Sequence, residues 1–168
     1  MSDRTIYLAG GCFWGLEELF RQQKGVTNTE VGYTGGSNDS PSYENHDSHA
    51  ETLAVSFNDN KTSYKQLLDF FFRVHDPTTK DRQGNDIGKS YRSAIFYQSE
   101  EERSQALEVI AEVDKSGLYP NAVVTTLEKY DKFWSAEDYH QDYLQKNPGG
   151  YTCHYIRSET PILRLASK

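Results

Sequence analysis

Short apolar runs alternate along this chain with segments in which apolar residues recur at helical spacing. The first run covers residues 5–9 and stops at a pair of glycines, after which Phe13, Leu16 and Phe20 fall on one helical face until Gly25. This pattern predicts a strand, a tight turn and a helix. Because similar units follow, we expect a mixed α/β fold in which helices pack on a sheet.

The later segments are interpreted in the same way. Strands are predicted over 26–33, 51–57, 91–98 and 122–130, and helices over 61–73, 99–117 and 135–146. Ser99 with Glu102, and Ser135 with Asp138, have the spacing of a capping box at a helix start. Residues 35–48 and 76–90 have the composition of loops, and the tail shows no clear period. Functional residues are expected in these loops and in the tail.

The bulk composition restricts the class of protein. A chain of 168 residues fits one domain, and its net charge of -7 would repel nucleic-acid phosphates. No segment approaches the roughly 20 apolar residues of a membrane span, and the apolar stretch in the first eleven residues is too short for a signal peptide. We therefore expect a soluble cytoplasmic protein without nucleic-acid or membrane partners, and nothing demands more than a monomer.

The chain has two cysteines, Cys12 and Cys153. In a reducing compartment a disulfide between them would be transient and catalytic rather than structural. Cys12 lies in the stretch AGGCFWG, where the first predicted strand turns into a helix. A helix N-terminus favours the thiolate and lowers the thiol pKa. A nucleophile and a buried structural cysteine are equally compatible with this position, and Phe13 and Trp14 could be core residues or could line an apolar pocket.

Glu51 begins the third predicted strand, directly after a loop. A carboxyl group partly buried among aromatic side chains would have a raised pKa and could donate a proton near neutral pH. An exposed glutamate at the end of a strand is the alternative. The segment GNDIGKS at 84–90 is one residue short of a phosphate-binding loop and follows a polar stretch, so nucleotide binding is rejected.

The histidines give no clear metal pattern. His46, His49, Glu51, His75 and Asp76 lie in or beside loops without the close pairing of zinc ligands. We therefore expect neither a metal nor a cofactor. His140 could orient the tail by hydrogen bonding, and His154, beside Cys153, could tune that thiol.

Seven segments occur along the chain in the order GCFWG (11–15), VGYTGG (31–36), PSYE (41–44), HAE (49–51), HDPTT (75–79), RQGNDIGKSYRSAIFY (82–97) and AEDYHQDYLQKNPGGY (136–151). Taken together, they resemble the A-type peptide methionine sulfoxide reductases. The resemblance implies a single domain over 1–168. Its fold would be a two-layer α/β sandwich with a mixed sheet and a ferredoxin-like core. Residues 147–168 would form an irregular tail carrying the resolving cysteine.

The resemblance also implies a reaction, the reduction of methionine-S-sulfoxide, free or in peptides and proteins, and thus the repair of oxidised proteins. By analogy Cys12 is the nucleophile, Glu51 the acid that protonates the sulfoxide oxygen, and Cys153 the resolving thiol. The analogy further assigns the oxygen-holding hydroxyls to Tyr43 and Tyr91, a positioning role to Asp86, and the methyl pocket to Phe13 and Trp14. A Cys12–Cys153 disulfide would then be reduced by thioredoxin.

Two departures from the family pattern are visible. The stretch YENHDSHAE at 43–51 is shorter than the usual loop, which bears on the position of Tyr43. The tail has one cysteine, so a relay through a third thiol is excluded. Two other functions remain open alternatives: a cysteine hydrolase that pairs Cys12 with His140, and a binding module with an aromatic groove.

Overall fold

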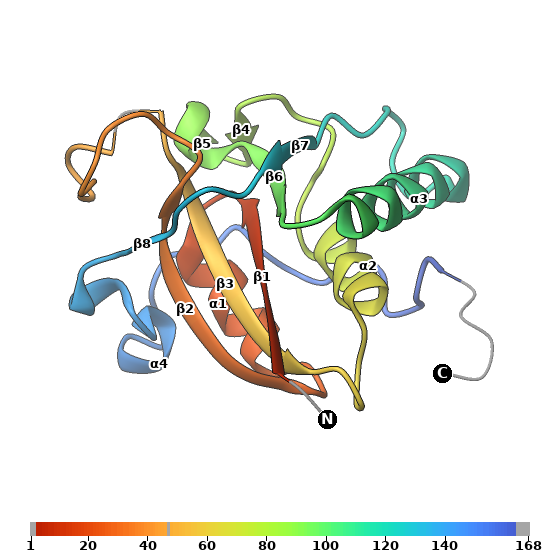
Figure 1. The fold of residues 1–168 in the computed structure, drawn as a ribbon, viewed down its shortest axis with the longest axis horizontal. Helices are drawn as coiled ribbons and strands as arrows, with labels where there is room; N and C mark the ends of the chain where they lie inside the picture. Colours follow the sequence, from red (N-terminus) through yellow and green to blue (C-terminus); the bar gives the residue numbers. More distant parts are fainter. Residues whose placement is uncertain (1–2, 47, 164–168) are drawn as a thin grey trace.

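A computed structural model of the chain describes residues 3–46 and 48–163, and its architecture is mixed α/β (Figure 1). In the described residues six strands form one sheet in the order β7-β6-β1-β3-β2-β8. These strands are β1 (Asp3–Gly10), β2 (Val26–Thr34), β3 (Ala50–Asn58), β6 (Ser93–Tyr97), β7 (Thr126–Lys129) and β8 (Trp134–Ser135). The helices are α1 (Phe13–Arg21), α2 (Tyr64–Val74), α3 (Glu100–Ser116) and α4 (Tyr143–Lys146).

The strand directions bring the functional segments to one edge of the sheet. β1 is antiparallel to both β3 and β6, β2 is antiparallel to β3, and β7 is parallel to β6. In this register Gly10 pairs with Ser93, and Tyr33 pairs with Glu51. The end of β1, the starts of β3 and β6 and the end of β2 therefore meet at the same edge.

The two faces of the sheet are covered differently. One face packs against α1, α2 and α3 in a continuous apolar core, built from residues such as Leu8, Phe20, Leu53, Phe71 and Val109. The opposite face carries small side chains, mainly alanines, and there the rings of Tyr7 and Tyr130 stack with their centroids 4.3 Å apart. This asymmetry follows from alternation, since successive strand residues point to opposite faces.

The predicted helices before residue 117 are confirmed, with small changes at their ends. α2 begins after Ser63, whose hydroxyl accepts the N–H of Gln66. α3 is capped by Ser99, which accepts the N–H of Glu102, and ends at Gly117 in the left-handed conformation. The reciprocal half of the expected capping box is absent in this described segment, because the Glu102 carboxylate accepts the N–H of Gln98 instead.

The predicted helix over 135–146 is wrong. Ser135 belongs to β8, which pairs with β2, and its hydroxyl bonds the Glu30 carboxylate. Asp138–His140 form a single 3₁₀ turn, and Asp142 then adopts a positive φ of 55°, so that only the short helix α4 follows. Pairing with the sheet edge and the turn at Asp142 override the local helical pattern.

Two further segments differ from the predictions. The strand expected over 122–130 is reduced to β7, because the N–H of Val123 bonds the Asp114 carboxylate and that of Val124 bonds the Pro77 carbonyl. The loop over 76–90 contains a two-stranded hairpin formed by β4 (Arg82–Gln83) and β5 (Asp86–Ile87), followed by a 3₁₀ turn, Lys89–Tyr91.

The described part of the tail has no regular helix or strand after α4, and it crosses the helical face of the core. The N–H of Arg157 bonds the Arg73 carbonyl at 2.7 Å, and the N–H groups of Ile162 and Leu163 donate to the Asp69 carboxylate at 3.1 and 2.6 Å. Residues 164–168, which the predicted tail included, lie outside the described residues.

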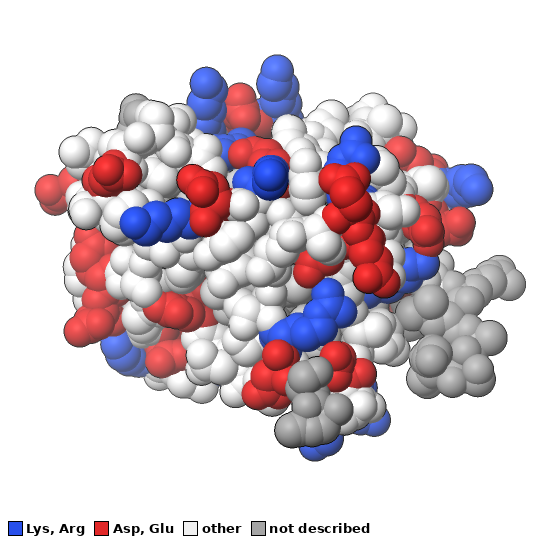
Figure 2. Space-filling view, in the orientation of Figure 1, with Lys and Arg blue, Asp and Glu red and all other residues white. Residues whose placement is uncertain are grey.

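The surface in Figure 2 carries acidic and basic side chains interspersed with one another on the face shown. Within residues 3–46 and 48–163, none of the helices is long and apolar enough to cross a membrane.

Candidate active site

Cys12 lies at the edge where the strand ends meet. It is the residue before the first turn of α1, and its side chain is 7% exposed. The preceding Gly11 has a positive φ of 98°, a conformation that favours glycine and permits the sharp reversal from β1 into α1. The turn thus presents the Cys12 sulfur at a helix N-terminus, as the sequence predicts.

The predicted lowering of the Cys12 pKa is wrong for this structure. Burial raises the pKa of the Cys12 thiol above its ordinary value, and the negative charge of Glu51 raises it further. The N–H of Trp14 acts in the opposite direction, as expected at a helix N-terminus, but it is outweighed. The thiol is therefore protonated at neutral pH in the resting protein.

Glu51 is buried rather than exposed, with 1% of its surface accessible. Its Oε1 accepts the N–H of Phe13 at 3.2 Å, and its Oε2 has no hydrogen-bond partner among the described residues. Burial raises the pKa of Glu51 to about 8 despite that hydrogen bond. The carboxyl group is thus mostly protonated at pH 7, and its free oxygen can donate to a ligand at the site.

Two tyrosines lie beside Glu51. Burial, followed by the charge of Glu51, raises the pKa of both Tyr91 and Tyr43, so both hydroxyls are hydrogen-bond donors at neutral pH. Despite the short loop, the N–H of Tyr43 bonds the Glu137 carboxylate at 2.9 Å, and this contact holds the residue at the site. Tyr43 is 38% exposed and therefore forms part of the rim.

Phe13 and Trp14 play different structural parts. Phe13 is fully buried in the core, 5.7 Å from the Tyr33 ring and 5.2 Å from the His140 ring. Trp14 is half-buried, stacked on Tyr143 at 3.7 Å, and its indole N–H donates to Nδ1 of His140 at 2.9 Å. His140 therefore fixes the indole rather than the tail.

Asp86 and Cys153 come together at the turn of the β4–β5 hairpin. The Cys153 sulfur lies 4.0 Å from Oδ2 of Asp86 and 4.0 Å from the Gln83 carbonyl oxygen, and its one proton can be donated to either. The hydroxyl of Tyr151 donates to the same Asp86 oxygen at 3.1 Å. Sequence reasoning missed Tyr151, although its two-residue spacing from Cys153 was a usable signal. Both cysteines are free thiols in this structure.

Three of the other histidines also have described hydrogen-bond partners. His75 contacts the Phe71 carbonyl and the Ser93 hydroxyl, and His49 contacts the Gly36 N–H and the Asn38 carbonyl. The ring of His154 bonds the Gly10 carbonyl at 2.6 Å. Its only other described hydrogen bond runs from its backbone N–H to the Thr152 hydroxyl. No described contact therefore supports the prediction that His154 tunes the Cys153 thiol. No group of described side chains could hold a metal ion.

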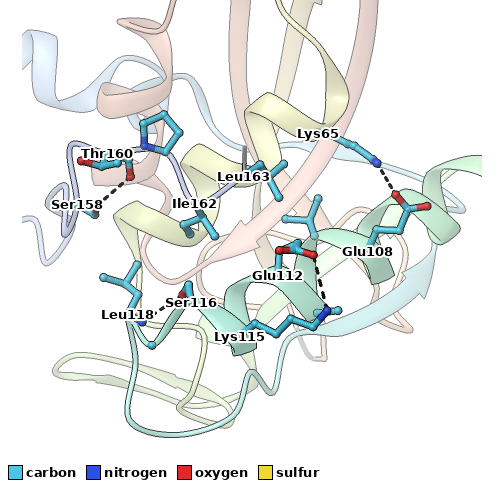
Figure 3. Close-up of a pocket in the computed structure, with 14 residues that line it drawn as sticks. Lys65, Glu108, Glu112, Lys115, Ser116, Leu118, Ser158, Thr160, Ile162 and Leu163 are labelled. Atoms are coloured by element: carbon cyan, nitrogen blue, oxygen red, sulfur yellow. Dashed lines mark hydrogen bonds and ion pairs between the residues drawn. The ribbon is translucent and has the colours of Figure 1, made fainter. Parts of the chain in front are cut away.

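A cleft of about 1370 Å³ lies elsewhere, between α3 and the tail (Figure 3). Two ion pairs line it, Lys65–Glu108 and Lys115–Glu112, and each pair is neutral overall. None of the predicted site residues lines it, and its described wall ends at Leu163. The cleft therefore has no part in the chemistry of the thiol site.

Comparisons with known proteins agree with the resemblance. The family model described as peptide methionine sulfoxide reductase matches residues 4–164. A peptide methionine sulfoxide reductase MsrA of Nocardia farcinica is 58% identical over 95% of this chain and 94% of its own. Reduced Mxr1 of Saccharomyces cerevisiae has a TM-score of 0.87 at 38% identity and 93% coverage of both chains. Mxr1 in complex with Trx2 has a TM-score of 0.65 at 28% identity, covering 93% and 91%.

Proposed function

This chain belongs to the peptide methionine sulfoxide reductase family, and from that membership we propose that it reduces the S epimer of methionine sulfoxide, free or within proteins, to methionine. The observation that carries the assignment to this site is the pairing of a buried thiol with a buried protonated acid, Cys12 with Glu51. The proposed role of the protein is the repair of oxidised methionine residues.

The proposed first step needs a thiol and a proton donor on opposite sides of the substrate sulfur. The sulfoxide sulfur accepts a nucleophile once its oxygen is protonated, and Glu51 has an unpartnered oxygen with which to do this. The Cys12 sulfur attacks the substrate sulfur, and the substrate sulfur–oxygen bond breaks. The released hydroxide then attacks the Cys12 sulfur as the sulfur–sulfur bond breaks, so that the methionine sulfur keeps the electron pair and Cys12 becomes a sulfenic acid. The Cys12 proton replaces the proton that Glu51 gives up, so atoms and charge balance.

Substrate selection follows from the polarity of the site. The hydroxyls of Tyr43 and Tyr91 would hold the sulfoxide oxygen, while the indole of Trp14, fixed by His140 and Tyr143, would receive the methyl group beside Phe13. Unoxidised methionine offers these donors no oxygen, which costs about 1–3 kcal/mol for a donor that the bound side chain shields from water. Binding of the product is weakened for the same reason.

The second step closes a Cys12–Cys153 disulfide. A sulfenic acid condenses with a thiol to give a disulfide and water. We assign recycling to thioredoxin, because a structural relative forms a complex with Trx2 and because a low-potential dithiol suits the reduction. Two free thiols at rest fit a cytoplasmic location, where such disulfides are transient.

We also assign the core to the ferredoxin-like arrangement. The order of its elements is β1, α1, β2, β3, α2, β6, and the strands lie in the order β6-β1-β3-β2 with antiparallel neighbours. The packing of α1 and α2 on one face of the sheet supports this assignment.

The test is mass spectrometry of a peptide with both sulfoxide epimers, incubated with the protein and a thioredoxin system. We expect the S epimer alone to lose one oxygen. Cys153→Ser should convert about one substrate per protein and then stop, because its sulfenic acid cannot be resolved. Absence of oxygen loss with the natural chain would refute the proposed function, and sustained turnover by Cys153→Ser would remove Cys153 from the cycle.

A further inference from the structure

The segment that carries Cys153 sends alternate side chains to two different neighbours. Thr152 and His154 face α1 at Gly15, where an added Cβ would overlap the Thr152 hydroxyl and lie 2.7 Å from Nδ1 of His154. Tyr151 and Cys153 face the β4–β5 hairpin and meet at Asp86. The segment is therefore held from both sides.

His154 fixes the side that faces α1. Burial lowers the pKa of His154 to about 4, so its ring is neutral at pH 7. A carbonyl oxygen only accepts hydrogen bonds, so Nε2 carries the proton and donates to Gly10 at 2.6 Å. This bond links the residue after Cys153 to a residue just before Cys12.

Asp86 organises the other side. One of its oxygens, Oδ2, receives both the Tyr151 hydroxyl at 3.1 Å and the Cys153 thiol at 4.0 Å. The hydrogen bond from Tyr151 orients the carboxylate, and the Cys153 sulfur lies within hydrogen-bond distance of the same oxygen, with the Gln83 carbonyl as its alternative acceptor. Asp86 thus has an arrangement suited to accepting the proton from the resolving thiol.

We propose that Asp86 accepts the proton of the Cys153 thiol as the Cys12–Cys153 disulfide forms, with Tyr151 and His154 as positioning residues. This inference rests on the proposed function and adds a second task to the positioning of substrate. Burial raises the pKa of the Cys153 thiol, a hydrogen bond from Tyr151 lowers it, and the charge of Asp86 raises it again. The protonated resting thiol needs a base before it can attack.

The step balances as follows. The proton of the Cys153 thiol moves to Asp86, and the sulfur attacks the Cys12 sulfenic acid with the electron pair that remains. The sulfur–sulfur bond forms as the sulfur–oxygen bond breaks, and the departing hydroxide takes the proton back from Asp86. One sulfenic acid and one thiol therefore give one disulfide and one water.

The experiment is a single turnover of the reduced full-length protein with a methionine-S-sulfoxide peptide and no thioredoxin. Methionine release reports the first step, loss of the second free thiol reports the second, and dimedone labels the sulfenic acid between them. Asp86→Asn, Tyr151→Phe and the control Tyr155→Phe are compared. Tyr155 lies two residues beyond Cys153 and is 60% exposed, with its ring against Arg157.

We expect Asp86→Asn to lengthen the interval between methionine release and disulfide formation by about 100-fold, the lower range for loss of a general base. Tyr151→Phe should lengthen it by about tenfold, the effect of one hydrogen bond. Both should accumulate dimedone adduct, and Tyr155→Phe should behave like the natural chain. The Asp86→Asn defect should shrink as pH rises, because the thiol then ionises without a base.

Two results would overturn the inference. One is an interval in Asp86→Asn equal to that of the natural chain, and the other is a defect that stays constant with pH, as a purely structural role would give. In both cases methionine release by the natural chain would still support the proposed function. A natural chain that releases no methionine would instead refute the proposed function itself.

Discussion

Burial and the charge of Glu51 together determine the protonation of Cys12. The charge of Glu51 raises the pKa of the Cys12 thiol, and burial keeps Glu51 largely neutral below pH 8. In its neutral form Glu51 does not oppose a thiolate, and in the proposed mechanism it holds the proton that the substrate oxygen requires. Ionised Glu51 would lose both properties, so the proposed mechanism uses the protonated acid.

The pH dependence of the free energy of unfolding tests the burial of Glu51. The pKa of Glu51 is 4.5 in its ordinary environment and about 8 in the folded chain, so the folded state binds the proton more tightly. Stability should therefore fall as pH rises from 4.5 to about 8, by about 4 kcal/mol from this group. Glu51→Gln, which cannot ionise, should remove that fall. Urea unfolding at several pH values measures it, and an unchanged pH slope in the variant would contradict the prediction.

The prediction of which side chains lie together was better than the prediction of their protonation states. The position of Cys12 at a strand-to-helix turn was visible in AGGCFWG, but its burial was not. A helix N-terminus stabilises a nearby negative charge by about 0.3–1 kcal/mol. Full burial shifts the pKa of a side chain by up to about 3–5 units, and each unit corresponds to about 1.4 kcal/mol. The larger effect depends on packing from distant segments and reverses the predicted direction.

Among the elements, the shortest ones were the hardest to predict. β4 and β5 have two residues each, too few to show a period, yet their hairpin places Asp86 against Cys153 and Tyr151. The last predicted helix failed because Asp142 is fixed by long-range contacts. Its N–H bonds the buried Glu17, and its carboxylate pairs with Arg21 at 2.8 Å. Longer elements such as α3 carry enough periodic residues to be found from sequence.

The contact between α1 and the tail gives a prediction at this scale. Gly15→Ala should push Thr152 and His154 away from α1, since the added Cβ leaves no room for either side chain. We expect a loss of about 1–3 kcal/mol in unfolding free energy, the usual cost of overpacking. Disulfide formation should also slow, because Cys153 lies between the two displaced residues.

Gly149→Ala is the matched control for that substitution. Gly149 lies in the tail itself, whereas Gly15 lies in α1, and an added Cβ at Gly149 meets no described atom within 4 Å. Urea unfolding and thiol titration of the two variants, measured side by side, check the prediction. Equal stability and equal disulfide rates in both variants would show that the contact with α1 does not hold the tail.

Across the whole molecule, the sheet brings the thiol, the acid and the tyrosines to one edge, while the tail is fastened to the helices. Asp69, 2% exposed on α2, accepts the N–H groups of Ile162 and Leu163 and pairs with Arg73. Arg73 in turn donates to the Ser158 carbonyl at 3.0 Å. These contacts hold the tail at Ser158, Ile162 and Leu163, five to ten residues after Cys153.

Asp69→Asn tests whether Asp69 holds the tail against α2. Its amide keeps the shape of the carboxyl group but loses the charge and one acceptor oxygen, at a cost of about 1–3 kcal/mol. We expect trypsin to cleave after Arg157 about tenfold faster, because local opening of the tail becomes more frequent. Asp39→Asn, at an exposed position between β2 and β3, serves as the control. Equal cleavage of both variants would argue against a role for Asp69 in holding the tail.

In the proposed cycle, the bond between His154 and Gly10 favours Cys153 over other thiols as the first to reach the oxidised Cys12. It ties the neighbour of one thiol to the neighbourhood of the other, so the second thiol is present at an effective concentration far above that of any free thiol diffusing in. A sulfenic acid that waits is exposed to further oxidation to the irreversible sulfinic form. A short tether thus shortens the lifetime of the vulnerable intermediate and protects the catalyst from the oxidants whose damage it repairs.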